Sequence, residues 1–212
     1  MVKLRRAALA AALLVLAAGP AMAYPDRPIR LILGFPPGGS ADLMARAIQP
    51  IVEKRLGQPL VIESKAGAGG VIAADVAAKA TPDGHMIALV GAGALSINVS
   101  LNEKMPYDPL QDLAPVTLLA AIPFVLIAPA SSPAKSVADI VALARAKPDG
   151  FSIGHGGNGT AMHLSAQLFN QMAGVTTTLV PYRGSTPVAS DVLAGHVQLG
   201  VSDITSAIVP HG

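Results

Sequence analysis

Residues 35–42 read Phe35-Pro36-Pro37-Gly38-Gly39-Ser40-Ala41-Asp42. They follow a short apolar run, residues 29–34, and precede a helical pattern, so they predict a strand, a glycine-rich turn and a helix start. Adjacent glycines let backbone N–H groups converge on one point, and the start of a helix adds partial positive charge. The turn is therefore predicted to bind an anion without a charged side chain. The alternative is a plain tight turn in which Ser40 or Asp42 caps the helix.

A comparable unit occurs at Gly154-His155-Gly156-Gly157-Asn158-Gly159-Thr160, after the strand-like residues 151–153. Its glycines match the Gly-x-Gly-x-x-Gly dinucleotide fingerprint, but residues 174–182 lack the acidic residue that a nicotinamide cofactor requires about 20 positions on. We therefore predict no cofactor. Two anion-binding turns instead predict a receptor that closes on a small acid. A β-branched residue at Gly39 or Gly157 is predicted to abolish binding, because such residues resist the backbone conformations that these turns need.

The N-terminus has the pattern of a secretory signal. Lys3, Arg5 and Arg6 precede an apolar segment, residues 7–18, and Ala21-Met22-Ala23 fits the small-x-small cleavage rule. A membrane anchor is the less favoured alternative, because the apolar segment is too short to cross a hydrocarbon layer of about 30 Å. We expect residues 1–23 to be a signal peptide that is cleaved after Ala23, and the mature protein to lie in the periplasm.

Composition excludes several other classes of protein. Of the 15 basic residues, 3 lie in the signal, whereas all 13 acidic residues lie beyond it, so the mature chain has a net charge of 12 − 13 = −1. This charge argues against nucleic acid as a partner, and with 3% aromatic residues and no Trp there is no platform for stacking bases. The absence of cysteine excludes disulfides and thiolate metal sites.

Strand-like and helical patterns alternate beyond the signal, which predicts an α/β fold with mostly parallel sheets. The expected strands cover residues 30–35, 60–63, 86–91, 116–119, 124–128, 151–153, 177–181 and 197–201, and the expected helices cover 41–56, 71–79, 137–146, 160–172 and 187–194. A Pro- and Asp-rich stretch, residues 105–109, interrupts this rhythm. It divides the chain into a first domain, residues 24–106, and a second domain, residues 107–205.

Finer features follow from the same patterns. Leu43, Ala47, Ile51 and Val52 are expected on one face of the first helix. The strand 86–91 is expected to be buried because it is apolar throughout, and residues 92–94 are expected to form a small-residue turn at its end. Ser136 is expected to cap the helix that follows it, with Asp139 completing a start that resembles a capping box.

Five side chains are candidates for binding or chemistry: Ser40, His155, His163, Arg183 and Asp203. His163 is expected to fix the second glycine turn or to contact a ligand, and no zinc site is predicted, because His155 and His163 lack a nearby carboxylate. Asp203, at the end of a strand, is expected either to accept a ligand ammonium or to cap the next helix. Arg183 is expected to be a solvated loop residue rather than a carboxylate ligand. A secreted hydrolase or transferase using Ser40 or His163 is the less favoured alternative, because no Gly-x-Ser-x-Gly motif is present.

Six motifs occur in order along the mature chain and carry a family resemblance. They are Phe35-x-Pro37-Gly38-Gly39-x-x-Asp42, Gly67-Ala68-Gly69-Gly70, Pro82-Asp83-Gly84, Gly157-Asn158-Gly159-Thr160-x-x-His163, Pro181-Tyr182-x-Gly184 and Asp191-x-Leu193-x-Gly195. With them the chain resembles the Bug-type extracytoplasmic receptors of tripartite tricarboxylate transporters. The resemblance implies a type II periplasmic binding protein fold, with two α/β domains, a cleft between them and no enzymatic activity.

The resemblance also implies a ligand, partners and a set of ligand-binding residues. The ligand would be a small carboxylate, either a di- or tricarboxylate, an acidic amino acid or an aromatic acid, and the partners would be the membrane components of the transporter. The implied binding residues of the first domain are Phe35, Pro37, Gly38, Gly39, Asp42, Ala92 and Gly93. Those of the second domain are Gly157, Asn158, Gly159, Thr160, His163, Tyr182, Gly184 and Asp203. No catalytic or metal-binding residue is implied.

Length departs from the family pattern. Residues 206–212 stand where the chain of a family member begins its return to the first domain, so the resemblance implies an incomplete first domain. Residues 86–90 would then form an exposed apolar edge. The alternative to a working receptor is a truncated fragment that binds nothing. In a receptor, the hinge is expected near residues 105–108 and 202–206.

Overall fold

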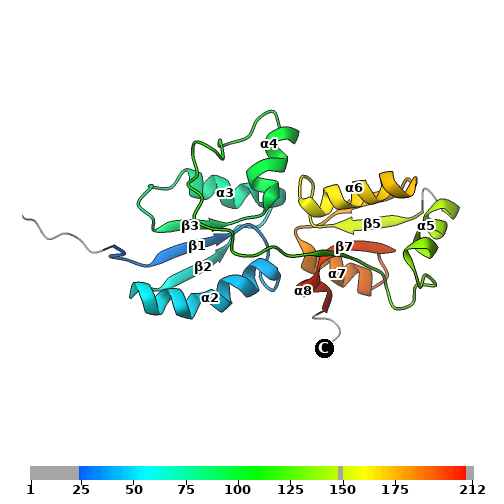
Figure 1. The fold of residues 1–212 in the computed structure, drawn as a ribbon, viewed down its shortest axis with the longest axis horizontal. Coiled ribbons are helices and arrows are strands. Elements are labelled where there is room, and N and C mark those ends of the chain that lie inside the picture. Colours follow the sequence, from blue (N-terminus) through cyan, green and yellow to red (C-terminus); the bar gives the residue numbers. More distant parts are fainter. Residues whose placement is uncertain (1–23, 148–149, 209–212) are drawn as a thin grey trace, which may run out of the picture.

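Two sheets organise the residues that the computed structural model describes, which are 24–147 and 150–208. The first has the strand order β2-β1-β3 and the second β4-β7-β5-β6. Each sheet with its helices forms one unit, and the two units lie side by side along the long axis of the molecule (Figure 1). The predictions for residues 1–23 and 209–212, including the signal peptide and its cleavage after Ala23, lie outside the described residues.

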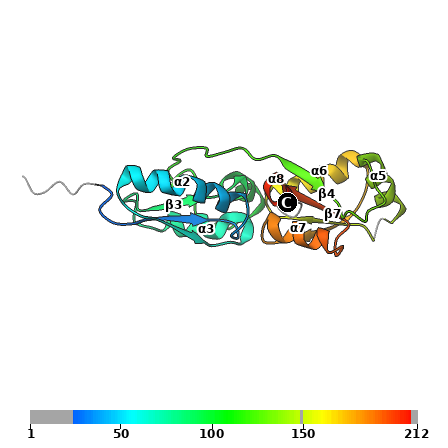
Figure 2. The same ribbon diagram turned by 90° about the horizontal axis from the view of Figure 1, so that it is seen from below.

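The first unit is a parallel sheet between helices. Its strands are β1 (Ile29–Leu33), β2 (Leu60–Ser64) and β3 (Met86–Leu89), and its helices are α2 (Ser40–Leu56), η1 (Ala68–Gly70), α3 (Val71–Ala78), η2 (Gly93–Ile97) and α4 (Asn98–Leu101). Figure 2 shows α2 and α3 on opposite faces of the sheet. Helix α2 ends at Gly57, whose left-handed backbone directs its N–H to the carbonyl of Glu53.

The buried face of α2 differs from the expected one. Ala41, Asp42 and Ala45 are buried, whereas Leu43 is 45% and Ile51 56% exposed. The small alanines allow the helix to approach β1 closely, so the face is set by that approach rather than by the largest apolar residues. Of the predicted face, Val52 alone packs against the cluster around β1.

Three further predictions, for residues between 86 and 119, are wrong. Strand β3 is half-buried rather than buried, because it is an edge strand of the described sheet. Residues 116–119 form no strand; Val116 is 78% and Leu118 82% exposed, and no described strand pairs with them. The residues after β3 begin a π-helical turn that continues into α4, where the sequence suggested only a small-residue turn.

The second unit places helices on both faces of a mixed sheet. Its strands are β4 (Phe124–Ile127), β5 (Ser152–His155), β6 (Thr178–Pro181) and β7 (Leu199–Asp203), and its helices are α5 (Val137–Ala146), α6 (Ala161–Ala173), α7 (Ser185–Leu193) and α8 (Ile204–Ile208). Strands β5, β6 and β7 are parallel, and β4 runs antiparallel to β7. Its core divides into one cluster around Ile153 and Leu199 and another around Val188 and Val192. The remaining expected elements are present, with ends that differ by only a few residues.

The predicted cap of α5 is confirmed. The Ser136 hydroxyl accepts a hydrogen bond from the Asp139 N–H, so one of the free donors of the first helical turn is satisfied. The Asp139 carboxylate in turn accepts from the Lys135 N–H at 2.9 Å.

Among the described helices, none is long and apolar enough to cross a membrane.

The boundary between the two predicted domains, 106/107, remains a prediction, although one residue beside it can be placed. Tyr107 is buried with Val71 and Ala94 in the first unit, and its hydroxyl donates to the Ala94 carbonyl at 2.7 Å. Burial in an apolar cluster with a satisfied hydroxyl holds Tyr107 in the first unit rather than in the second. The chain then passes in irregular structure to β4 (Figure 1).

Candidate ligand-binding pocket

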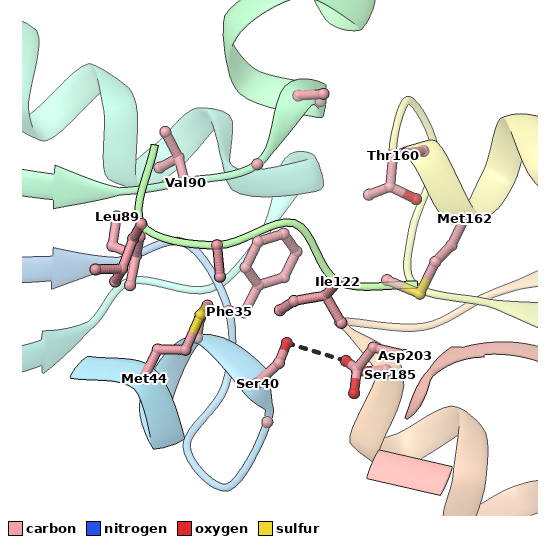
Figure 3. A pocket seen from close by; sticks show the side chains of 18 of the residues that line it. Phe35, Ser40, Met44, Leu89, Val90, Ile122, Thr160, Met162, Ser185 and Asp203 are labelled. Atoms are coloured by element: carbon pink, nitrogen blue, oxygen red, sulfur yellow. Dashed lines mark hydrogen bonds between the residues drawn. The ribbon is translucent and has the colours of Figure 1, made fainter. Parts of the chain in front are cut away.

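A cavity of about 300 Å³ lies between the two units and is lined by residues of both (Figure 3). The segments that follow β1 and β3 reach it from the first unit, and the carboxyl end of β7 reaches it from the second. In α/β proteins, ligands bind outside the carboxyl ends of the strands. The cavity is lined by Phe35, Pro36, Gly39, Ser40, Ala41, Met44, Gly69, Leu89, Val90, Gly91, Ala92, Gly93, Leu95, Thr117, Leu118, Leu119, Ala120, Ile122, Phe124, Thr160, Ala161, Met162, Ser185, Thr186 and Asp203.

Three helices begin at the wall of this cavity. The lining includes the starts of α2, from Gly39 to Ala41, of α6, from Thr160 to Met162, and of α7, at Ser185 and Thr186. The first N–H groups of a helix have no partner within the helix and carry partial positive charge. Neither Gly39 nor Gly184 supplies a side-chain cap at its helix. The wall therefore offers backbone donors that suit an anion.

The first glycine turn is braced from within by Asp42. Its carboxylate accepts hydrogen bonds from the Gly38 N–H and from the Arg46 guanidinium, each at 3.0 Å. The hydrogen bond from Arg46, assisted by that from Gly38, outweighs burial and lowers the pKa of Asp42. Asp42 is buried and lies outside the cavity lining. Its hydrogen bonds fix the turn.

The expectation that Gly39 has a backbone conformation that β-branched residues resist is wrong. Gly39 has a φ of −86°, which any residue can adopt, whereas its neighbour Gly38 has a φ of +81°. In the second turn the expected backbone conformation is confirmed, because Gly157 has a φ of +117°, and the loss of binding on substitution stays a prediction. The special backbone of the first turn therefore belongs to Gly38, one position before the residue that the sequence singled out.

The second glycine turn is held by Thr160 and His163. The Thr160 hydroxyl donates to the Gly157 carbonyl at 2.6 Å and accepts from the His163 N–H, so it also caps α6. The His163 Nδ1 atom lies 3.4 Å from the Gly159 nitrogen, which donates to it. Of the two roles considered for His163, the structure therefore shows the one that fixes the loop.

His155 is fully buried beneath this turn. Its ring stacks on that of His163 with the centroids 4.6 Å apart, and its Nδ1 accepts from the Gly157 N–H at 3.3 Å. Its Nε2 has no hydrogen-bond partner among the described residues. Burial, together with the neighbouring His163, lowers the pKa of His155 to about 4.

The free energy of unfolding is expected to depend on His155 at mildly acidic pH. As the pH falls below about 6.5, the unfolded chain protonates this residue while the folded chain does not, so stability that is complete above pH 6.5 is lost down to pH 4. The expected loss over this window is about 3 kcal/mol, measured by urea unfolding at a series of pH values. His155→Gln, which does not titrate, should flatten the slope above pH 4. An equal slope in both proteins would contradict the assignment.

Asp203, at the end of β7, is the centre of a buried hydrogen-bond network. One carboxylate oxygen accepts from the Ser40 hydroxyl at 3.2 Å and from the Ser185 hydroxyl. The other accepts from the Thr205 hydroxyl at 2.5 Å and from the Ser206 N–H at 2.8 Å, which caps α8. Burial alone would raise the pKa of Asp203, but the hydrogen bonds outweigh it and lower the pKa, so the group is ionised.

Two hydrogen bonds join the units on either side of the cavity. Ser40 of α2 reaches Asp203 of β7, as the dashed line in Figure 3 shows. On the other side, the buried Asn98 amide donates to the Gly159 carbonyl at 3.2 Å. Glycines allow this approach, because a Cβ atom added at Gly93 would lie 2.9 Å from the Gly159 oxygen. The structure therefore holds the two units in contact around the cavity.

The structure separates the 15 predicted binding residues into two groups. Those that line the cavity are Phe35, Gly39, Ala92, Gly93, Thr160 and Asp203. Those that lie outside its lining are Pro37, Gly38, Asp42, Gly157, Asn158, Gly159, His163, Tyr182 and Gly184.

Several members of the second group shape the turns around the cavity rather than its wall. Tyr182 packs against the cluster around Val188, and its hydroxyl donates to Asp191 at 2.7 Å. Burial and that hydrogen bond raise the pKa of Tyr182 to about 12. Gly184, with a φ of +119°, allows the chain to turn into α7. The exposed Arg183 does not line the cavity, as expected of a solvated loop residue.

Sequence reasoning missed most of the apolar wall. The missed residues include Met44, Leu89, Leu118, Ile122, Phe124 and Met162. Their apolar character gave no signal, because it is equally typical of a core. Ser185 and Thr186 were also missed, although two hydroxyl residues directly after a glycine and at a helix start could have indicated a second capped or anion-binding turn.

The comparisons with known proteins agree with this architecture. The family described as TctC, the tripartite tricarboxylate transporter family receptor, matches the chain over residues 44–210. A UPF0065 protein from the tcbD-tcbE intergenic region of Pseudomonas sp. (strain P51) is 39% identical over 184 residues, which are 87% of this chain and 54% of that protein. Protein BugT of Bordetella pertussis is 36% identical over 186 residues, covering 87% of this chain and 57% of BugT.

Solved structures show the same fold. R. palustris Rpa4515 with adipate has a TM-score of 0.84 and 34% identity, with 89% of this chain and 64% of that chain covered. MatC from Rhodopseudomonas palustris with bound malate has a TM-score of 0.82 and 32% identity, with the same coverage of 89% and 64%. The predicted two-unit α/β fold of a periplasmic binding protein is thereby confirmed. The chain spans a little over half the length of these curated relatives and under two thirds of these solved chains.

Proposed function

Because the chain belongs to the tripartite tricarboxylate transporter receptor family, we propose that it captures a small carboxylate in the periplasm and delivers it to the membrane components of such a transporter. Its relatives in this family are solute-binding receptors and not enzymes. The Ser40 hydroxyl, the candidate nucleophile of the hydrolase alternative, donates to Asp203 rather than to a histidine base.

The observation that carries the proposal is the meeting of three helix starts at one cavity. Helices α2, α6 and α7 each present their first turn to it, and they come from both units. None of the lining residues is Lys, Arg or His, so the positive potential there comes from backbone N–H groups. Such a wall suits a carboxylate, whose oxygens accept several hydrogen bonds at once.

The N-terminal sequence supports a periplasmic location for this activity. Residues 1–23 have the basic, apolar and small-residue order of a secretory signal. The two hydrogen bonds that join the units would form when the receptor closes on its ligand, and the predicted hinge regions, residues 105–108 and 202–206, would allow it to open.

Thermal unfolding of the purified protein tests the proposal. A panel of monocarboxylates, dicarboxylates, tricarboxylates and acidic amino acids is added separately, and one acid is expected to raise the midpoint. At about 100 times its Kd, that acid should add about 2.7 kcal/mol of apparent stability. A cooperative transition that no acid shifts would contradict the carboxylate proposal. The absence of any cooperative transition would favour the alternative that the chain is a fragment that binds nothing.

A further inference from the structure

Building on the proposed carboxylate receptor, we propose that this cavity selects acids with a single carboxylate and an uncharged, apolar body. Acids with a second carboxylate, and amino acids with an ammonium group, are excluded by the chemistry of the wall. The structure of a 34%-identical neighbour carries adipate, a dicarboxylate, so the inference sets this chain apart from that neighbour.

Much of the remaining lining is built from hydrocarbon side chains. Phe35, Met44 and Leu89 line it from the first unit, and Leu118, Ile122 and Phe124 line it from the segment that links the units and from β4. Figure 3 shows Phe35, Met44, Leu89 and Ile122 around the space above Ser40. An apolar ligand body gains free energy by leaving water for such a wall, at about 25 cal/mol per Å² of buried area.

Away from the three helix starts, the lining offers a second carboxylate no charged partner. Among the lining residues, all within the described part of the chain, Asp203 is the one ionisable side chain, and it is negatively charged. A charge that loses water against apolar side chains without a compensating partner is disfavoured. A second negative charge near Asp203 would in addition be repelled.

Most hydroxyl groups of the lining already donate hydrogen bonds within the protein. Those of Ser40 and Ser185 donate to Asp203, and that of Thr160 donates to the Gly157 carbonyl. The Thr117 hydroxyl lies at 3.5 Å from the Leu118 carbonyl. Thr186, at the start of α7, is the lining hydroxyl for which the described residues supply no partner. It stands beside the free N–H groups of α7, where it can donate to the one carboxylate that those groups hold.

An ammonium group is excluded for a different reason. A carboxylate has about four lone-pair sites, and the four hydrogen bonds to Asp203 occupy all of them. Two roles were expected of Asp203, accepting a ligand ammonium or capping the next helix, and the structure shows the capping role. A ligand ammonium would have to displace Ser40 or Ser185, and it would otherwise face the positive ends of three helices.

Isothermal titration of the purified protein with two matched ligand pairs tests the inference. Hexanoate and adipate share six carbons and differ by one carboxylate, and 3-phenylpropanoate and phenylalanine share a skeleton and differ by one ammonium. The member without the extra charge is expected to bind at least about tenfold more tightly in each pair. Equal or tighter binding of adipate or phenylalanine would overturn the inference while leaving the receptor proposal intact. Binding of no acid in this set or in the wider panel would overturn the receptor proposal itself.

A charge placed in the wall gives an independent measurement. Leu118 lines the cavity but is 82% exposed, so Leu118→Lys removes little core packing. The variant is expected to raise the affinity for adipate relative to hexanoate at least about tenfold, because a lysine can pair with the second carboxylate. The control is Leu110→Lys, at a residue that is 88% exposed and outside the lining, and it should leave the ratio unchanged. Equal ratios in the two variants would contradict the placement of the ligand body against residues 117–122.

Discussion

Replacing Gly93 by alanine is expected to lower ligand affinity by about 10- to 100-fold. A Cβ atom at this position would lie 2.8 Å from the Gly69 carbonyl oxygen and 2.9 Å from the Gly159 carbonyl oxygen. Both are backbone atoms, so neither can rotate away, and Gly159 belongs to the second unit. Overpacking of this kind costs about 1–3 kcal/mol, and each 1.4 kcal/mol corresponds to a tenfold change in affinity.

The expected loss of affinity comes from the contact with Gly159 of the second unit, whereas the contact with Gly69 lies within the first unit and is expected to lower its stability. Gly93 does not have a left-handed backbone, so alanine introduces no conformational strain of its own. The second unit can withdraw from the added methyl group, which separates Asn98 from the Gly159 carbonyl and opens the cavity. Titration with the acid that raises the melting midpoint would measure the loss, and circular dichroism would check that both sheets remain folded.

Gly91→Ala is the matched control for this experiment. Gly91 also lines the cavity and lies two residues earlier, but an added Cβ there would meet the Phe35 ring at 3.7 Å, an ordinary contact distance. Its affinity should stay close to that of the unaltered protein. Equal affinities for the two variants would show that the close approach at Gly93 does not limit binding.

Asp203→Ala is expected to destabilise the second unit by about 3–5 kcal/mol. The carboxylate is 4% exposed and accepts hydrogen bonds from Ser185, Thr205 and Ser206 within its own unit. Alanine leaves these buried donors without their acceptor and removes the cap of α8, and each effect is unfavourable. Urea unfolding at neutral pH, where the carboxylate is ionised, would measure the difference.

Ser40→Ala separates the two roles of this carboxylate. It removes the one hydrogen bond to Asp203 that comes from the first unit and leaves the other three intact. We expect a change in unfolding free energy of less than about 1 kcal/mol, with a weaker affinity for the acid. A large loss of stability in Ser40→Ala, or none in Asp203→Ala, would contradict this division of roles.

Local sequence patterns were sufficient to predict most of the helices and strands. Glycine turns, hydroxyl caps and apolar periodicity act over a few residues, so the start of α6 at Thr160 and the cap of α5 at Ser136 could be predicted correctly. Residues 116–119 show the limit of such patterns. They have the composition of a strand, but a strand needs a neighbour to accept its hydrogen bonds, and in the described chain they cross between the units instead.

For the site, the sequence predicted where the turns lie but not which atoms face the cavity. Asp42 and Tyr182 belong to recognisable motifs, yet one braces a turn through Gly38 and Arg46 and the other packs toward Asp191. The direction of a side chain depends on partners that lie elsewhere in the fold, as the apolar wall around Ile122 also illustrates.

The sequence by itself determined that this chain alternates strands and helices, carries two glycine-rich helix starts and has the motifs of the tripartite tricarboxylate transporter receptor family, because each of these features depends on neighbouring residues. The tertiary structure alone decided that Ser40 meets Asp203, 163 residues away, and that Asn98 meets Gly159, 61 residues away. It likewise decided that the Asp203 carboxylate accepts four hydrogen bonds and that much of the cavity lining is apolar. These contacts depend on how two separately folded sheets approach each other, and that approach is set by packing and close backbone contact between distant segments rather than by any local pattern.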